Sequence, residues 1–486
     1  MIGLRVPRDR LGSDDESAWR IATDDCVGGS TVRLATQPSI VSRPVTSEVD
    51  PTRPSFFVSA AGTFGANVAV AVLSLGNVLI TSRALGATGR GEIALLTTIA
   101  LLSANVALLG VQEANANLAG REPRLRPSLL TNSVLLAAFL GACAALIVAA
   151  VIALSPSLGG GVSVGARWVA LAAIPVLVLQ AYVQLLAQAS YGFRVTNLAW
   201  LFAPLVNVFV NGALALFGVL SVQSVVATWV AGQVVATALV VRFAVRAYGF
   251  GRPSGPVARR SLAFGLKSHL GRVMMLGNYR LDQWILGVVA GPRELGVYSV
   301  AVVWSETLFF LPTALTSVQR PDLVRASADR AASVVAPVFR ACVIVTVGLG
   351  LALFALAPAL CIGLFGEEFR DSTIDLRILV FGAVGMVALK QLGGALTAQR
   401  RPLLASSGIG IALLTTIALD FALIPQYGAL GAAIASSVAY TAGGLAMALI
   451  FRRVFSDGHG LIPRLRDLRK LVQRLWLWAS RLASRS

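Results

Sequence analysis

The sequence predicts an all-α integral membrane protein with 12 transmembrane helices, arranged as two parallel-repeat six-helix lobes around a central cavity. Three observations support this fold class. Of the 486 residues, 56% are hydrophobic and only 13% are charged, which is typical of a polytopic membrane protein. The apolar residues gather into twelve stretches. A glycine-bounded turn after the first stretch recurs after the seventh.

Each of the twelve apolar stretches is close to the roughly 20 residues that cross a bilayer as a helix. We expect these spans at 57–81, 92–114, 129–154, 167–189, 198–218, 224–247, 262–290, 296–319, 336–363, 375–397, 403–424 and 428–451. The preceding segment, 1–55, is rich in Ser, Thr, Pro and Gly and lacks the apolar core of a signal peptide. It is therefore predicted to be a disordered cytoplasmic tail.

The positive charges in the loops predict the orientation of the chain. One set of alternating loops holds fourteen Arg and Lys residues, whereas the opposite set holds six. Because cytoplasmic loops carry the excess of positive charge, the first set and both termini are predicted to be cytoplasmic. We expect a multi-pass protein of the bacterial cytoplasmic (inner) membrane. The net charge of +18 then requires no nucleic acid partner.

The C-terminal segment, 454–486, has an amphipathic pattern. Apolar residues recur at i+3 and i+4 from Leu461 to Leu482, and most Arg and Lys side chains lie off that stripe. We predict a basic amphipathic cytoplasmic helix that binds the anionic lipids of the inner leaflet. The alternative is a helix packed on the cytoplasmic loops of the protein itself.

The repeated turn predicts how the spans are grouped. Gly86 and Gly91 enclose four residues, and Gly291 and Gly296 repeat this spacing 205 positions later. Six spans separate the two turns, so both repeats have the same orientation in the membrane. This predicts an N-lobe over 56–250 and a C-lobe over 251–453. Transporters built from such repeats bind their substrate between the two halves.

The seventh stretch is apolar yet carries several charged residues, most of which share one face of a helical wheel. A charge at the bilayer centre costs roughly 2.5–3.5 kcal/mol on insertion scales, so a cationic face predicts a water-filled cavity that receives an anion. Arg272 and Arg280 are the leading substrate contacts, because guanidinium groups match phosphate oxygens in a bidentate manner. The other candidates are Lys267 and His269 as further anion contacts, and Tyr279, Asp282 and Gln283 as cavity-lining residues.

The first stretch carries its own polar stripe, which includes Asn67, Ser74 and Asn77. A shift of 205 positions aligns Asn67 with Arg272 and Asn77 with Asp282. We therefore expect this stripe to form the opposite wall of the cavity. The alternative is that these side chains join neighbouring helices by hydrogen bonds.

Structural ion pairs are the alternative explanation for the two arginines, with Asp282 or Glu306 as the carboxylate partner. Asp282 is expected to orient an arginine rather than to bind substrate. Glu113, Lys390 and Asp420 are further polar residues within apolar stretches, and we rank them below the seventh stretch as candidate site residues.

No residue pattern in the sequence is typical of catalysis. It has no Walker loop, no glycine-rich dinucleotide turn and no cluster of His, Cys and Asp, and its four cysteines lack metal-ligand spacing. We therefore predict a protein that is not an enzyme and that needs no cofactor or metal. Transport without an ATP-binding motif must be passive or driven by an ion gradient.

Three segments carry a family resemblance: 83–92 (RALGATGRGE), 280–298 (RLDQWILGVVAGPRELGVY) and 423–435 (LIPQYGALGAAIA). They resemble the polysaccharide and O-antigen flippases (Wzx-like, the polysaccharide transporter family) of the multidrug/oligosaccharidyl-lipid/polysaccharide (MOP) exporter superfamily. The resemblance covers about residues 56–452.

The resemblance implies a MATE-like, V-shaped bundle of two six-helix lobes. Such a protein moves polyprenyl-diphosphate-linked oligosaccharide from the inner to the outer leaflet by alternating access, for the synthesis of surface polysaccharide. Cationic residues of the cavity hold the diphosphate, a role that falls on Arg272 and Arg280 here. Polysaccharide polymerases and glycosyltransferases are candidate partners.

Four other functions remain as alternatives. A flippase for lipid-linked peptidoglycan precursors usually has two extra spans. A MATE-type drug or cation antiporter needs a carboxylate facing the cavity. A membrane glycosyltransferase, polymerase or ligase needs a large extracytoplasmic loop, and no predicted outer loop exceeds about fifteen residues. A non-transporting membrane scaffold would not need cations in the middle of the membrane.

Overall fold

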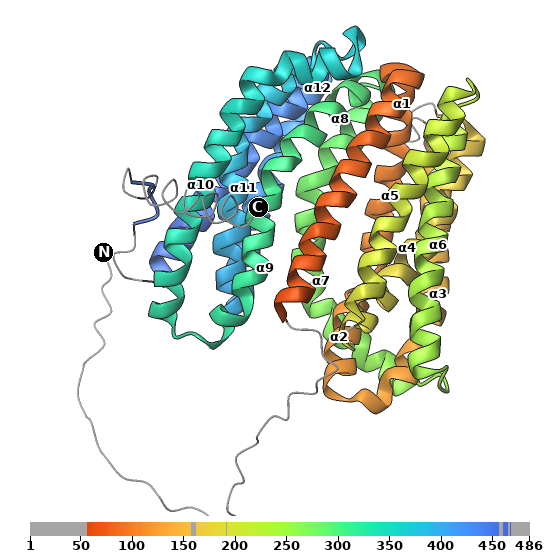
Figure 1. Cartoon of the computed structure of the whole chain (residues 1–486), viewed down its shortest axis with the longest axis vertical. Helices are drawn as coiled ribbons and strands as arrows, with labels where there is room; N and C mark the ends of the chain where they lie inside the picture. Colours follow the sequence, from red (N-terminus) through yellow and green to blue (C-terminus); the bar gives the residue numbers. More distant parts are fainter. Residues whose placement is uncertain (1–55, 157–161, 191, 456–459, 465–466, 468–486) are drawn as a thin grey trace, which may run out of the picture. The chain divides into compact units, whose positions relative to one another are not determined.

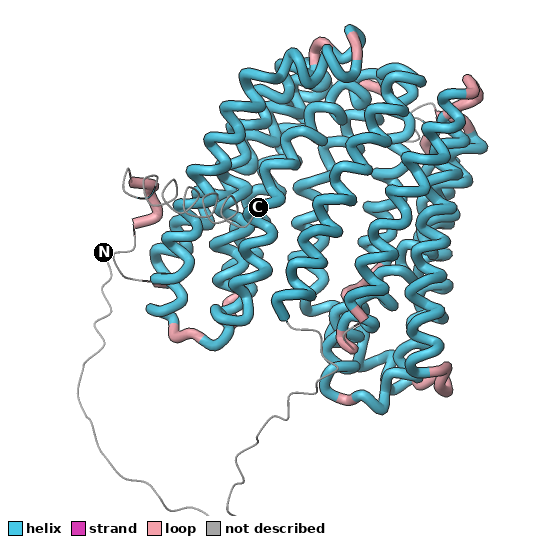
Figure 2. Tube along the Cα trace, in the orientation of Figure 1, coloured by secondary structure: helices cyan, strands magenta, loops and turns pink. Residues whose placement is uncertain are grey.

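The protein consists of helices joined by turns and loops, with no strand among the residues that the structure describes (Figure 2). The computed structural model describes residues 56–156, 162–190, 192–455, 460–464 and 467, all within one of the chain's two compact units, Thr52–Ser486. The all-α prediction is confirmed. The predicted tail 1–55 and most of the predicted C-terminal helix 454–486 lie outside the described residues.

The helices follow one another with short connections (Figure 1). Those of the first half of the chain are α1 (Phe56–Ala107), α2 (Val111–Arg121), the 3₁₀ turn η1 (Pro123–Leu125), α3 (Arg126–Leu154), α4 (Val164–Gln188), α5 (Phe193–Leu216) and α6 (Val222–Tyr248). Those of the second half are α7 (Gly255–Val289), α8 (Pro292–Glu306), the 3₁₀ turn η3 (Thr307–Phe309), α9 (Phe310–Arg325), α10 (Ala328–Pro358), the π-helical turn η4 (Ala359–Gly363), the 3₁₀ turn η5 (Glu367–Phe369), α11 (Ser372–Ala398) and α12 (Pro402–Val454).

Nine helices in the described part of the chain are long and apolar enough to cross a membrane by length and composition, so this is a multi-pass membrane protein. Helices α1 and α12 have 52 and 53 residues, and each is broken by a glycine. At 1.5 Å per residue, each is about 80 Å long, more than twice the roughly 30 Å of apolar bilayer core. Helix α7 is not among the nine. The predicted count of twelve spans stays a prediction.

Glycine supplies the backbone conformation at the sharp turns between successive helical arms. Gly86 interrupts α1 with φ 68° and ψ −173°, and Gly291, which precedes α8, has nearly the same conformation with φ 91° and ψ 171°. Only glycine adopts such angles readily. The repeat predicted from the sequence therefore has a counterpart in the backbone. Gly428 breaks α12 in a similar way, with φ 54°.

Two glutamates cap the helical arms that begin after the breaks at Gly86 and Gly428. The backbone N–H of Ala87 donates to Glu368 Oε2 at 2.9 Å, and the N–H of Ala429 donates to Glu294 Oε2 at 3.1 Å. A carboxylate at the N-terminus of a helical arm satisfies a free N–H group and complements the positive end of the helix dipole. Because Glu368 belongs to η5, its bond joins the two halves of the chain.

The arms that follow Gly86 and Gly291 cross at their backbones. A Cβ added to Gly91 would overlap the carbonyl oxygen of Pro292, and a Cβ added to Gly296 would overlap the carbonyl oxygen of Ala87. Ala87 and Pro292 are themselves 205 positions apart, as are the two glycines, so the crossing has pseudo-twofold symmetry. Small residues permit such close approach between membrane helices.

Buried apolar side chains form three clusters in the described residues. One lies mainly in the helices from α2 to α6, and a second in the segment from η3 to α12. The largest contains residues of α1 and α4, in the first half of the chain, and of α8, α11 and α12, in the second half. The halves of the chain thus share a packed core around the crossing. The lobe boundaries at 56–250 and 251–453 stay a prediction.

Candidate functional site

Helix α7 contacts both halves of the chain. Toward its start, Gly265 packs against Gly110, where a Cβ on either glycine would overlap the backbone of the other. Further along, the Asn278 amide donates to the carbonyl of Ile409 in α12 at 3.1 Å and accepts from the Thr416 hydroxyl at 3.4 Å. The polar residues predicted on this helix therefore lie between the α1–α2 junction and α12.

Arg272, the leading candidate, is held by an ion pair. Its Nη1 lies 3.1 Å from Oε1 of Glu113, in the first turn of α2. Both side chains are about half exposed, at 45% and 42%. Exposed ion pairs contribute only about 0–1 kcal/mol, so this pair is a weak tether. Arg272 therefore remains available to a competing anion.

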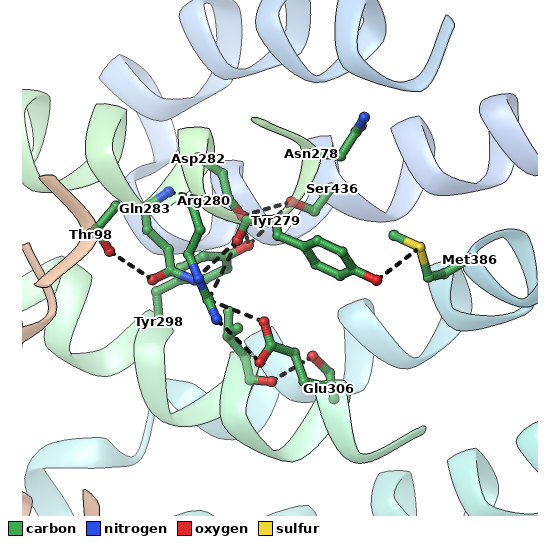
Figure 3. A network of polar contacts seen from close by, with 12 residues as sticks. Thr98, Asn278, Tyr279, Arg280, Asp282, Gln283, Tyr298, Glu306, Met386 and Ser436 are labelled. Atoms are coloured by element: carbon green, nitrogen blue, oxygen red, sulfur yellow. Dashed lines mark hydrogen bonds and ion pairs between the residues drawn. The ribbon is translucent and has the colours of Figure 1, made fainter. Parts of the chain in front are cut away.

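Arg280 pairs with Glu306, the last residue of α8, with Nη1 and Oε1 3.1 Å apart (Figure 3). These side chains are less exposed than the first pair, at 26% and 28%. The carboxylate that neutralises this arginine is thus Glu306 rather than Asp282. The structural ion pair that the sequence left open is present, and it occupies a second position on the same helix.

Two more cations lie near Arg280 and Glu306. Arg90, in the second arm of α1, donates from Nε to the Ser299 hydroxyl at 3.1 Å and interacts electrostatically with Arg280. Lys390 in α11 interacts electrostatically with Glu306. We call Arg90, Arg280, Lys390 and Glu306 the cationic cluster. It contains three positive charges and one negative charge, and Asp282, which also interacts electrostatically with Arg280, lies beside it as a second negative charge. The remaining excess of positive charge suits a multivalent anion.

Aromatic rings hold the ammonium group of Lys390. Its Nζ lies 5.3 Å from the ring centroid of Tyr279 and 6.0 Å from that of Phe309. Both distances permit cation–π attraction. The Tyr279 hydroxyl contacts the sulfur of Met386 at 3.5 Å (Figure 3). Tyr279 therefore supports a cation through its ring.

Asp282 is buried among hydrogen-bond donors. Its carboxylate accepts from the hydroxyls of Tyr298 at 2.6 Å and Ser436 at 3.0 Å, and from the backbone N–H of Gln283 at 2.7 Å (Figure 3). It also interacts electrostatically with Arg280. The direct contacts join α7 to α8 and α12. Asp282 thus affects Arg280 by electrostatic attraction over a distance, and its direct hydrogen bonds are to other residues.

The candidates in the first half of α7, Lys267 and His269, have few partners among the described residues. Lys267 is exposed. The Nε2 atom of His269 lies 3.1 Å from the carbonyl oxygen of Val106, and its Nδ1 has no hydrogen-bond partner among the described residues. Their role in anion binding stays a prediction.

The polar residues of α1 that were predicted to form one wall of the cavity differ in their surroundings. Asn77 Oδ1 accepts from the amide of Asn211 in α5 at 2.8 Å, a bond of the kind that joins neighbouring helices. Ser74 is exposed, and the side chain of Asn67 lies outside the described residues. Gln283 contacts the second arm of α1 instead, where its Oε1 accepts from the Thr98 hydroxyl at 3.4 Å.

Arg90 was missed from the sequence, and Glu113, Lys390 and Asp420 were ranked low. Arg90 was assigned to a loop, although the helix is continuous through it. Asp420 in α12 is fully buried, and neither of its carboxylate oxygens has a hydrogen-bond partner in the described structure. It also interacts electrostatically with Asp282. A buried carboxylate without partners is costly unless it is neutralised, and such residues within a membrane helix are commonly functional.

The helix arrangement is that of MOP-superfamily transporters. The chain is similar to the lipid II flippase MurJ in an inward closed conformation, with a TM-score of 0.66, 13% identity, and coverage of 82% of this chain and 90% of that one. It is also similar to an inward-facing multidrug resistance MATE transporter of the superfamily (TM-score 0.65, 16% identity, 82% and 98% covered). A third similar structure is a superfamily transporter from Pyrococcus furiosus, described as having a binding pocket of reverse polarity (0.60, 14%, 82% and 94%).

The proteins that share this fold are transporters and a flippase rather than enzymes. No curated protein matches the chain. Residues 80–374, more than half of the sequence, match the family of polysaccharide biosynthesis proteins. The chain belongs to this family.

Proposed function

We propose that this protein moves polyprenyl-diphosphate-linked oligosaccharide from the inner to the outer leaflet of the bacterial cytoplasmic membrane by alternating access. It would serve the synthesis of a surface polysaccharide. Membership of the polysaccharide biosynthesis family supports a role in that pathway, and the fold supports a function in transport. Both termini would be cytoplasmic, and polysaccharide polymerases and glycosyltransferases would act on the same lipid-linked substrate.

The cationic cluster is the observation that carries the proposal. A diphosphate presents several oxygens and about two negative charges. Arg90, Arg280 and Lys390 carry three positive charges against the two carboxylates of Glu306 and Asp282, so one positive charge remains in excess. Arginine binds phosphate through two parallel hydrogen bonds, whereas lysine acts as a point charge. Because Arg272 lies two helical turns before Arg280, α7 offers the headgroup a first contact and then a second.

The membrane potential favours this direction of transport. Moving one elementary charge across 100 mV is worth roughly 2.3 kcal/mol. The cytoplasmic side is negative, so an anionic headgroup gains free energy as it moves outward. The prenyl chain stays in the lipid while the polar headgroup crosses. The cationic cluster lowers the cost of placing the diphosphate in the bilayer core.

A competition measurement tests the substrate class. The purified protein is loaded with a fluorescent polyprenyl diphosphate carrying an oligosaccharide, and unlabelled competitors are added. We expect the same lipid as a monophosphate to compete poorly, because it has less charge and fewer acceptor oxygens. Efficient competition by a peptidoglycan precursor alone would favour that pathway. Competition by organic cations alone would favour an antiporter and contradict the proposal.

A further inference from the structure

Two helices of the bundle are interrupted next to the site. The arm of α1 that follows Gly86 ends before Leu109 and Gly110, which have φ of 45° and 73°, and α2 follows. The arm that follows Gly291 is α8, which ends at the 3₁₀ turn η3 before α9. We call these two places the α1–α2 break and the α8–α9 break. Such interruptions are where a helix bends most easily.

Each break has a glutamate beside it that is paired to α7. Glu113 lies three residues after Gly110, and its N–H donates to the Gly110 carbonyl at 3.1 Å. Glu306 is the residue directly before η3. Their partners are Arg272 and Arg280, the two arginines proposed to bind the diphosphate. The same side chains thus link the proposed ligand contacts to both breaks.

The two pairs lie at different levels of α7. Arg272 and Arg280 are eight residues apart, which is about 12 Å along a helix. Each arginine is held by a glutamate of a different helix, so a headgroup that reaches one arginine has not yet displaced the glutamate of the other. An arginine that turns to a phosphate with two negative charges leaves a carboxylate with one. The glutamate is then released from α7, and the adjoining break loses a tether.

We propose that Glu113 and Glu306 are positioning residues that hold the two breaks while the arginines are empty and release them when the diphosphate binds. Binding of the headgroup at Arg272 frees α2, and its passage to Arg280 frees α9. Re-formation of each pair expels the headgroup from that arginine. This inference rests on the proposed function. In it, the carboxylates of Glu113 and Glu306 couple binding of the headgroup to movement of the helices.

The chain offers a matched control. Arg260 of α7 also pairs with a glutamate, Glu122, at 2.6 Å. Arg260 is 54% exposed and Glu122 is 29% exposed, and Glu122 lies directly before η1, at the connection from α2 to α3, rather than next to the α1–α2 or the α8–α9 break. Glu122→Gln removes a comparable ion pair from the same helix. It should leave headgroup binding and transport unchanged.

The test measures binding and turnover separately. Wild type, Glu113→Gln, Glu306→Gln and Glu122→Gln are reconstituted in vesicles with a fluorescent polyprenyl-diphosphate oligosaccharide. We expect the first two variants to bind the lipid roughly five-fold more tightly, the factor for losing one weak competing ion pair. They should turn over several-fold more slowly, because expulsion of the headgroup is impaired. Glu306→Asp, which keeps the charge, should restore part of the turnover.

Spin labels report the movement itself. With the four native cysteines replaced, labels are placed at Arg124→Cys in η1 and Ser327→Cys between α9 and α10, both exposed positions. We expect substrate to change the distance distribution in wild type. Glu113→Gln and Glu306→Gln should shift it in the same direction without substrate. Glu122→Gln should not.

The possible failures are distinguishable. If wild type binds and transports the diphosphate lipid but Glu113→Gln and Glu306→Gln match Glu122→Gln, the inference is wrong and the proposed function stands. If wild type does not bind the lipid at all, both are wrong. Weaker rather than tighter binding by folded Glu113→Gln and Glu306→Gln would show that the carboxylates support the ligand, which also overturns the inference.

Discussion

Gly91 and Gly296 occupy equivalent places in two crossing helices, and each lies against a backbone carbonyl of the other helix. Gly91 faces Pro292, and Gly296 faces Ala87, so the contact repeats itself about a pseudo-twofold axis. The crossing joins the second arm of α1 to α8. It fixes the place where the cationic cluster lies, because Arg90 and Ser299 flank the two glycines.

The close contact between the two helices predicts that one methyl group added to either glycine lowers the stability of the protein. Gly91→Ala and Gly296→Ala should each lower the free energy of unfolding by about 1–3 kcal/mol, since the added Cβ has no space. The double variant should lose less than the two single losses together, because the sites share one contact. Thermal unfolding in detergent measures both effects. Gly120→Ala, with no neighbour within 4 Å, is the control and should be neutral or slightly stabilising.

The arginines of α7 should be required for transport. Arg272→Ala is expected to abolish export of surface polysaccharide, with the protein still present in the membrane. Arg280→Lys should also lose most activity, since lysine cannot make the bidentate contact. Export is measured as surface polysaccharide on cells that depend on the variant, with membrane content as the control. Normal export by Arg272→Ala would remove that residue from the proposed site.

Lys390 should contribute to affinity through its charge. Lys390→Gln keeps much of the side-chain volume but loses the cation above Tyr279 and Phe309, so lipid binding should weaken several-fold. The cation–π contact itself is worth roughly 0.5–1 kcal/mol or more. Arg377, whose guanidinium carbon lies 5.0 Å from the Phe354 ring centroid, provides a control outside the cluster. Equal effects of Lys390→Gln and Arg377→Gln on binding would argue against the cluster.

We expect the buried carboxylate of Asp420 to lower the free energy of unfolding and to have a functional role. Asp420→Asn replaces a buried carboxylate that has no hydrogen-bond partner in the described part of the chain by a neutral amide, so the folded protein should gain roughly 1 kcal/mol or more. Thermal unfolding in detergent measures the gain, and an export assay shows whether activity falls at the same time. A loss of stability would show that the carboxylate has a partner in the membrane-embedded protein.

The helical membrane fold followed from the sequence because span length and glycine spacing are local signals. The break at Gly86 was visible as a turn, and its match at Gly291 has the same backbone conformation. The identity of α7 as the polar helix was also visible. What the sequence placed wrongly was Arg90, since its glycine-rich surroundings resemble a loop although the helix continues through it.

The partners of the α7 side chains were harder to predict. Arg272 and Glu113 are separated by 159 positions, and a helical wheel gives direction without naming the neighbour. The helical wheel puts charged residues such as Arg272 and Asp282 on one face. In the structure Arg272 meets α2, Asn278 meets α12, and Asp282 meets α8 and α12, because a 35-residue helix passes several neighbours along its length.

The most direct test of the proposed function is transbilayer movement of the substrate. Vesicles are prepared with the purified protein and a fluorescent polyprenyl-diphosphate oligosaccharide, and an impermeant quencher is used to follow the labelled headgroup. We expect rapid movement of the headgroup, which an inside-negative potential accelerates in the outward direction and which Arg280→Ala reduces to the rate of protein-free vesicles. Movement equal to that of protein-free vesicles with the wild-type protein, or full activity in Arg280→Ala, would contradict it.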